Sequence, residues 1–277
     1  MKRKDFFEII ENIPLKDQDF ILKLRPRTTG LKEILPGQFV QVLVPHSNDT
    51  FLRRPISVCD VDEKERLLIL YMKKVGKGTK QLSLCKIGEE IDILYPLGNG
   101  FDYSHTQKPL LLGGGVGIAP MVYLAKKMVE KGIIPTVLLA GKTAESLTIR
   151  SFFQNERLKP NHEHGYKSNN EHGCEADCHL HLCTDDGSLG EKGIITQHSI
   201  MQRLNEFDTL YCCGPTPMMK AVARMAETAK IPCYVSLENM MACGLGACLC
   251  CVTPTKEHGN QCVCTEGPVF DSRELAW

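Results

Sequence analysis

Residues 109–120, PLLLGGGVGIAP, join a run of leucines to a glycine-rich turn. We predict a buried strand at Leu110–Leu112, a turn at Gly113–Gly117 and a helix that begins at Pro120, because proline suits the first turn of a helix. Gly132 ends that helix. Glycines at such a turn let a dinucleotide approach the helix N-terminus, where free N–H groups and the helix dipole favour phosphate.

The alternation of strand and helix continues beyond this turn. Strands that alternate with helices form a parallel, doubly wound sheet, so we predict an α/β domain over residues 106–237. Its further strands are expected at Thr136–Ala140, Leu180–Thr184, Thr209–Cys213 and Cys233–Leu237, and its clearest helix at Pro215–Lys230.

Before Lys108 the pattern consists of short β-type segments separated by turn residues such as Pro36-Gly37 and Gly88. Segments of this kind at even spacing predict a small antiparallel barrel or sandwich, which we assign to residues 1–105. The predicted strands are Phe20–Leu24, Phe39–Val44, Leu67–Met72 and Glu90–Leu94.

The composition excludes some classes of partner. The 277 residues include 33 basic and 33 acidic side chains and only 6% aromatics, so the chain lacks a basic, base-stacking surface for nucleic acid. The longest uncharged stretch, residues 109–125, is too short and too rich in glycine for a membrane span. Asp5 and Glu8 interrupt the apolar start of the chain, so we expect no signal peptide and a cytoplasmic protein.

Fourteen cysteines indicate metal or redox chemistry, and seven of them lie between Cys233 and Cys264. Four of these have the spacing C-x4-C-x2-C-x12-C, whose first three members match plant-type [2Fe–2S] ferredoxins. Thiolates are soft ligands suited to iron. Spacing alone leaves Cys250 and Cys262 as alternative ligands, and a structural zinc site is the alternative function of the set. The four cysteines are Cys243, Cys248, Cys251 and Cys264.

Three further motifs offer phosphate-binding or flavin-binding groups. Residues 53–57, RRPIS, supply an arginine fork for a pyrophosphate and a serine for a flavin ring edge, and residues 76–79, GKGT, supply backbone N–H groups. Residues 213–215, CGP, follow a predicted strand and open a helix, as residues 113–117 do. Two such turns at one sheet edge would flank a nucleotide. Each motif alone also fits an ordinary turn or packing glycines.

Residues 161–183 contain five histidines and three cysteines. These side chains are ligands for zinc or another transition metal, although their spacing fits no zinc finger. A solvated surface loop is the alternative. Neither interpretation changes the predicted function.

Taken in order, these motifs resemble the electron-transfer subunit of the NAD-dependent dihydroorotate dehydrogenase, within the ferredoxin-reductase-like superfamily. The superfamily shares the motifs from RRPIS to GGGVGIAP, whereas the segment MMACGLGAC within ENMMACGLGACLCCV at 238–252, with CTEGPVF at 264–270, is more particular to this subunit. The resemblance covers most of the chain. It implies an N-terminal antiparallel FAD-binding β-barrel at 1–105, an NAD-binding domain at 106–237 and a C-terminal [2Fe–2S] segment at 238–277.

The resemblance also implies site residues. It selects Cys264 over Cys262 as the fourth cluster ligand, because the family's fourth ligand lies just ahead of GPVF, and it places Cys213 near the nicotinamide. FAD would contact Arg54, Pro55, Ile56, Ser57, Leu70, Tyr71, Met72, Gly78 and Thr79; the NAD(H) site would include Gly114, Gly115, Gly117, Cys213, Gly214 and Pro215; the cluster would be bound by Cys243, Cys248, Cys251 and Cys264.

The function implied is electron transfer between NAD(H), FAD, the cluster and an FMN-containing catalytic subunit that oxidises dihydroorotate in pyrimidine (UMP) biosynthesis. The resemblance implies a heterotetramer of two subunits of each kind. FAD exchanges hydride whereas the cluster passes single electrons, so the chain needs no general acid or base and we expect no catalytic side chain. The alternatives are a related reductase subunit of a hydrogenase or of a ferredoxin-NADP transhydrogenase, and a non-catalytic zinc module.

Overall fold

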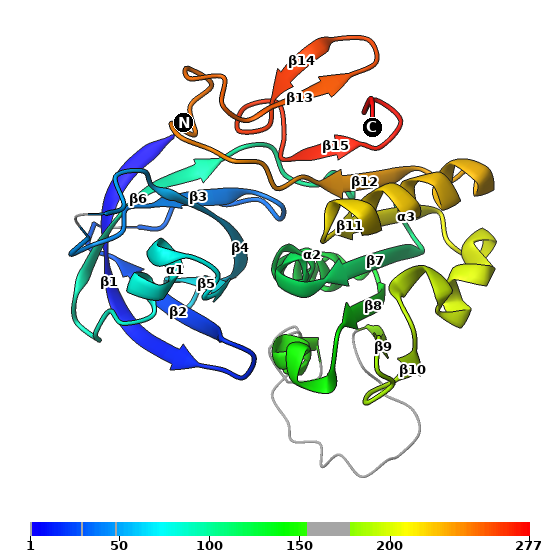
Figure 1. Ribbon diagram of the computed structural model, residues 1–277, viewed down its shortest axis with the longest axis horizontal. Coiled ribbons are helices and arrows are strands. Elements are labelled where there is room, and N and C mark those ends of the chain that lie inside the picture. Colours follow the sequence, from blue (N-terminus) through cyan, green and yellow to red (C-terminus); the bar gives the residue numbers. More distant parts are fainter. Residues whose placement is uncertain (1, 29, 48, 154–177) are drawn as a thin grey trace. The chain divides into compact units, whose positions relative to one another are not determined.

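The computed structural model describes residues 2–28, 30–47, 49–153 and 178–277 (Figure 1). The chain divides into two compact units: Met1–Phe101 with Tyr234–Trp277, and Asp102–Cys233. The cysteine-rich end of the chain therefore folds in the same unit as the N-terminal strands. The functional division into 1–105, 106–237 and 238–277 stays a prediction.

Six antiparallel strands close into a barrel in the first unit, in the order β1-β2-β5-β4-β3-β6. This confirms the predicted N-terminal barrel. Large side chains such as Phe7, Leu22, Leu68 and Tyr95 are fully buried in it. Its elements are β1 (Arg3–Pro14), β2 (Asp19–Pro26), β3 (Phe39–Val42), β4 (Arg54–Asp62), β5 (Leu67–Lys73), α1 (Lys77–Leu82) and β6 (Glu90–Leu97).

The sequence pattern does not predict β1, although β1 pairs with both β2 and β6 and so closes the barrel. Phe7 and Ile9 are completely buried two residues apart, as expected for one face of a strand. The preceding position of that face is Asp5, which is also buried. Because one of the three inward positions is a carboxylate, only two apolar residues alternate along this face. Two are too few to predict a strand from the sequence.

The second unit contains a parallel sheet in the order β10-β9-β8-β7-β11, which confirms the predicted α/β architecture. Helix α2 begins at Ile118, two residues before the predicted start at Pro120, because a 3-10 turn at Gly115–Gly117 leads into it. Its elements are β7 (Pro109–Gly114), α2 (Ile118–Glu130), β8 (Thr136–Gly141), β9 (His179–Thr184), β10 (Glu191–Lys192), β11 (Thr209–Cys213) and α3 (Thr216–Ala229), with further 3-10 turns at Ala144–Ser146, Thr148–Phe153, Ile195–Gln197 and Ser199–Glu206.

The C-terminal residues return to the first unit, where hydrogen bonds join them to the barrel. The Asn99 N–H donates to the Gly267 carbonyl at 2.6 Å, and Asn99 Nδ2 donates to the Glu266 carbonyl at 2.8 Å. This segment lacks apolar periodicity in sequence yet forms short antiparallel pairs, β12 with β15 and β13 with β14. The strands are β12 (Cys233–Ser236), β13 (Val252–Thr255), β14 (Gly259–Cys262) and β15 (Val269–Asp271).

In the described ranges, no helix is long and apolar enough to cross a membrane.

The carboxylate of Asp208 joins the starts of two neighbouring strands, β7 and β11. It accepts the backbone N–H groups of Gln107 at 2.6 Å and Lys108 at 2.8 Å, as well as the hydroxyl of Thr106. Burial opposes its ionisation, but these hydrogen bonds outweigh that effect and hold the pKa of Asp208 below its usual value.

A carboxylate with a depressed pKa contributes stability above the unfolded-state pKa of about 3.9, and this contribution is lost as the pH falls through the folded-state pKa. We therefore expect Asp208→Asn to lower the free energy of unfolding at neutral pH by about 1 kcal/mol, a value reduced for solvent access, and to weaken the acid dependence of stability. Urea unfolding at several pH values measures both effects, with the exposed Glu257→Gln as control. An unchanged acid dependence in Asp208→Asn would contradict the assignment.

Candidate functional site

A cavity of about 360 Å³ lies beside the start of β4 and the N-terminal end of α1. Three of the residues that the resemblance assigns to FAD line it: Arg54, Gly78 and Thr79. Two apolar side chains at the cavity, Phe51 and Val75, are strongly exposed, with 87% and 77% of their surface accessible. No motif in the sequence signals Phe51, which belongs to the connection that precedes β4.

The two arginines of the RRPIS motif have different surroundings. Arg53 Nη2 forms a 2.8 Å ion pair with Asp92, and Arg53 Nη1 donates to the Asp92 carbonyl at 2.9 Å, so Arg53 has a structural role in the barrel. The Nε of Arg54 is buried and has no hydrogen-bond partner among the described residues. A buried guanidinium N–H at the wall of a cavity fits an anionic ligand such as a pyrophosphate.

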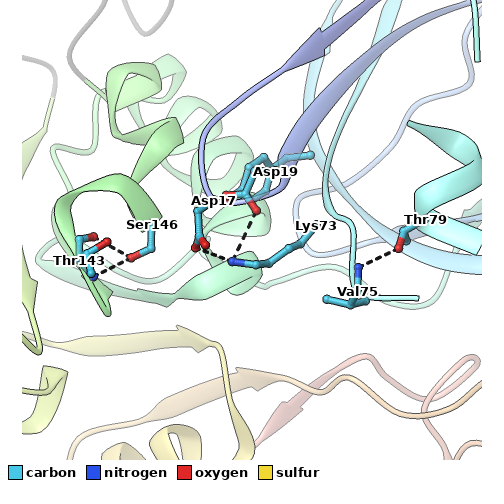
Figure 2. Close-up of polar contacts among 8 residues, drawn as sticks. Asp17, Asp19, Lys73, Val75, Thr79, Thr143 and Ser146 are labelled. Atoms are coloured by element: carbon cyan, nitrogen blue, oxygen red, sulfur yellow. Dashed lines mark hydrogen bonds and ion pairs between the residues drawn. The ribbon is translucent and has the colours of Figure 1, made fainter. Parts of the chain in front are cut away.

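The GKGT motif forms the first turn of α1, not the turn without a helix that its composition suggests. The Thr79 hydroxyl accepts the N–H groups of Val75 at 3.1 Å and Gly76 at 3.3 Å, and Figure 2 shows the first of these contacts. A Cβ on Gly78 would lie 3.0 Å from the Arg54 side chain. Gly78 therefore lets Arg54 lie against the start of α1, where the first N–H groups of the helix have no partners within it.

The end of β5 carries an ion-pair network. Lys73 Nζ lies 2.5 Å from Asp17 and 3.8 Å from Asp19 (Figure 2). The Tyr71 hydroxyl donates a hydrogen bond to Asp19. Two carboxylates thus neutralise the lysine, so Lys73 adds little positive charge for a flavin phosphate.

The other predicted FAD residues lie on two adjacent strands of the barrel. Pro55, Ile56 and Ser57 are half-buried on β4. Leu70 and Met72 on β5 are almost completely buried, which assigns their side chains to the core.

The two glycine turns of the second unit lie in contact. They follow β7 and β11, which are neighbouring parallel strands, so both turns lie at the carboxyl edge of the sheet. A Cβ on Gly117 would lie 2.4 Å from the Cys213 carbonyl oxygen, and one on Gly114 would lie 2.5 Å from Met218 Sδ. Only glycine allows this approach. The predicted residues Gly114, Gly115, Gly117, Cys213, Gly214 and Pro215 are thus brought together, as a nucleotide site at a sheet edge requires.

Backbone N–H groups converge on the first cysteine of the C-terminal loop. Cys243 Sγ accepts the N–H groups of Leu245 at 3.3 Å and Cys248 at 3.4 Å. Desolvation opposes ionisation of this thiol, but the N–H donors prevail and lower the pKa of Cys243 to about 6. A thiolate held in this way is ready to bind iron.

The other end of the loop holds the buried thiols of Cys251 and Cys264. Burial and a hydrogen-bond contact with Cys251 raise the pKa of Cys264 to about 12, although the N–H of Gly246 donates to its sulfur. Cys262 also adjoins Cys251, and burial raises its pKa. The two thiols differ in that the Gly246 N–H contributes to the pKa of Cys264 and not to that of Cys262. Metal binding would displace the protons from these thiols.

Side-chain contacts therefore join Cys243 to Cys248, and join Cys251 to both Cys262 and Cys264. Among the residues that the structure describes, no three His, Cys, Asp or Glu side chains are grouped closely enough to bind one metal ion. In a [2Fe–2S] cluster bound by four cysteines, each iron takes two of the ligands. Cys243 with Cys248 fits one iron, and Cys251 with either Cys262 or Cys264 fits the other. Gly244 and Gly246 have positive φ angles of 68° and 83°, which favour glycine and turn the chain around the site.

Residues 161–177 of the histidine- and cysteine-rich segment lie outside the described residues. In its remaining part, Cys178 and Cys183 are buried, and the Cys178 thiol donates to the Phe153 carbonyl at 3.6 Å. Burial raises the pKa of Cys183 to about 11. Metal binding by this segment stays a prediction.

Comparisons with known proteins show the class of oxidoreductase to which the chain belongs. The family of oxidoreductase NAD-binding domains matches residues 111–224. The solved structure of an NADH-dependent reduced ferredoxin-NADP oxidoreductase has a TM-score of 0.79 and 31% identity, over 98% of this chain and 90% of that chain. A ferredoxin reductase of carbazole 1,9a-dioxygenase, at 20% identity and a TM-score of 0.67 over 83% and 67% of the two chains, supports the fold alone. The protein is a ferredoxin-reductase-like oxidoreductase.

The family within that class follows from sequence. The iron-sulfur cluster binding domain of dihydroorotate dehydrogenase B matches residues 238–276. The electron transfer subunit of dihydroorotate dehydrogenase B (NAD(+)) from Geobacillus sp. (strain WCH70) is 41% identical over 87% of this chain and 86% of its own length. The subunit from Clostridium acetobutylicum is 39% identical over 99% of this chain and 98% of its own length. The chain belongs to this family of electron transfer subunits, whose cofactors are FAD, a [2Fe–2S] cluster and NAD.

The contact between the glycine turns can be tested at Gly117. Because a Cβ there would meet the Cys213 and Gly214 backbone at 2.4–2.6 Å, we expect Gly117→Ala to destabilise the protein by about 1–3 kcal/mol. Gly30→Ala is the matched control, since a Cβ at Gly30 would have no atom within 4 Å. Thermal unfolding of both variants measures the difference. Equal melting temperatures would show that the turns can separate without cost.

Proposed function

We propose that this chain transfers electrons between NAD(H) and the FMN-containing catalytic subunit of dihydroorotate dehydrogenase, in de novo pyrimidine (UMP) biosynthesis. The observation that supports this most is that one folded unit contains both the Arg54 cavity and the paired cysteines of residues 243–264. When bound, FAD and the cluster supply hydride and single-electron chemistry, respectively. The chain supplies binding and orientation.

Each motif has a distinct role in this proposal. The Arg54 guanidinium and the first turn of α1 at Gly78 and Thr79 bind the FAD pyrophosphate, and the half-buried side of β4 receives the flavin ring. The glycine turns that end β7 and β11 bind NAD(H). Cys213, buried beneath the second turn, shapes the nicotinamide pocket, and no side chain serves as a general acid or base.

Anaerobic spectroscopy of the protein co-purified with its catalytic subunit tests this function. We expect flavin and cluster absorption that bleaches on addition of NADH, with iron and acid-labile sulfide present in equal amounts. Dihydroorotate should bleach the same bands only when the catalytic subunit is present. A colourless, zinc-containing protein would overturn the proposal.

The rival function is reduction of NADP through ferredoxin, suggested by the ferredoxin-NADP oxidoreductase of similar fold. Its 31% identity is below the 39–41% of the dihydroorotate dehydrogenase subunits. Electron transfer from reduced ferredoxin to NADP, with no response to dihydroorotate in the complex, would favour this rival.

We further propose four cluster ligands: Cys243, Cys248, Cys251 and Cys264. The test compares Cys264→Ser with Cys262→Ser, because both thiols are buried beside Cys251 and differ in their contact with Gly246. We expect Cys264→Ser to lose most of its iron and sulfide and Cys262→Ser to keep both. The opposite result would assign the fourth ligand to Cys262.

The proposed assembly is a heterotetramer of two electron-transfer and two FMN-containing catalytic subunits, and its mass in solution tests the stoichiometry. The proposed location is the cytoplasm. The cysteines that the structure describes are all free thiols, which a reducing compartment maintains.

A further inference from the structure

Gln41 is an unusual residue for the barrel core. It lies on β3 between Val40 and Val42, and all three residues are completely buried. Neither the Nε2 nor the Oε1 of Gln41 has a hydrogen-bond partner among the described residues. Burial of a primary amide without partners is unfavourable, so a buried amide normally has a hydrogen-bonding function.

The Gln41 side chain is directed at the cysteine loop. A Cβ built on Gly244 would lie 2.9 Å from Gln41 Cγ and 3.0 Å from Gln41 Nε2. Gly244 follows the proposed ligand Cys243 and has a φ of 68°. The loop therefore approaches Gln41 at the one position where glycine leaves room for the amide.

Gln41 also adjoins the proposed flavin-binding strand. Its backbone pairs with that of Pro55 on β4. The Gln41 carbonyl accepts a hydrogen bond from Arg53 Nη1 at 3.3 Å. The backbone of Gln41 is therefore hydrogen-bonded, whereas its side-chain amide has no hydrogen-bond partner among the described residues. Gln41 thus has its main chain beside one cofactor site and its side chain against the other.

The side-chain amide of Gln41 indicates what kind of group would accept its hydrogen bonds. Gln41 Nε2 carries two N–H donors. The sulfur atoms of an iron-sulfur cluster accept hydrogen bonds, and such bonds help to set its reduction potential. They stabilise the reduced cluster more than the oxidised one, because the reduced cluster carries more negative charge. A donor next to Gly244 would therefore raise the potential.

We propose that Gln41 is a positioning residue for the cluster, and that its side-chain amide donates a hydrogen bond to the sulfur atoms held by the cysteine loop. This inference rests on the cluster ligands of the proposed function. It gives the barrel a direct influence on the cluster potential, in addition to its role in binding flavin.

The test is the cluster potential of Gln41→Leu in the complete complex, measured by redox titration with electron paramagnetic resonance. We expect the reduction equilibrium to shift about tenfold toward the oxidised cluster, a fall of about 59 mV for a one-electron couple. The FAD potential should stay unchanged. An unchanged cluster potential, or a shift confined to FAD, would overturn the proposal.

The matched control is Gln38→Leu. The Gln38 side chain donates to the Gly98 carbonyl at 2.7 Å and accepts the Leu35 N–H at 2.8 Å, so its amide is satisfied within the barrel. This variant should be less stable but keep the wild-type cluster potential. A fall in potential equal to that of Gln41→Leu would show that general loosening of the barrel is the cause, and would overturn the proposal.

A second measurement decides the case if Gln41→Leu retains no cluster. Pulsed electron paramagnetic resonance of the reduced wild-type complex, labelled with side-chain ¹⁵N-glutamine, should show a nitrogen coupled to the cluster. Absence of this coupling would refute the hydrogen bond. A wrong ligand assignment gives a different result. In that case Cys264→Ser keeps its iron, while the coupling between the glutamine nitrogen and the cluster is still observed in the wild-type complex.

Discussion

The hydrogen bonds of Asn99 fix the C-terminal segment to the barrel, and the proposed relay depends on them. Asn99 follows β6 and binds the Gly267 and Glu266 carbonyls. The neighbouring Gly98 allows this contact, because a Cβ there would lie 2.4 Å from Pro268 Cδ and 2.7 Å from the Gly267 carbonyl oxygen. The cysteine loop and the strands proposed to bind flavin are therefore parts of one folded unit. Electron transfer between their cofactors then requires no docking step within the chain.

Local hydrogen bonding divides the cysteines into two chemical types. Two N–H groups converge on Cys243 and favour its thiolate, whereas Cys251 and Cys264 lie buried against each other and Cys264 favours the thiol. Of the Cys243 and Cys264 thiols, that of Cys243 is therefore the more readily deprotonated. In the proposal above, Gln41 would add a side-chain donor to these backbone groups.

Much of the fold could be predicted because its signals are local. The leucines before Gly113 and the glycines after them specify β7, the turn and α2 within a few residues. Strand β1 could not be predicted, because the buried carboxylate of Asp5 interrupts the apolar alternation that marks a strand. The spacing of the cysteines predicted the cluster, but the choice between Cys262 and Cys264 needed the family pattern. The RRPIS motif predicted an arginine for the pyrophosphate, but the structural role of Arg53 depends on Asp92, which is distant in sequence. The position of Gln41 beside Gly244 has no sequence motif.

The order of the two units along the chain has a consequence for biosynthesis. Residues 102–233 form a complete unit inserted within the other, so the ribosome finishes this inserted unit before it makes the cysteine loop. The barrel strands are synthesised first and must await the final 44 residues, Tyr234–Trp277, before their unit is complete. The four proposed cluster ligands, Cys243, Cys248, Cys251 and Cys264, are therefore synthesised after the barrel strands and the inserted unit. A product that stops before Cys243 lacks all four proposed ligands, so it has no site for the cluster.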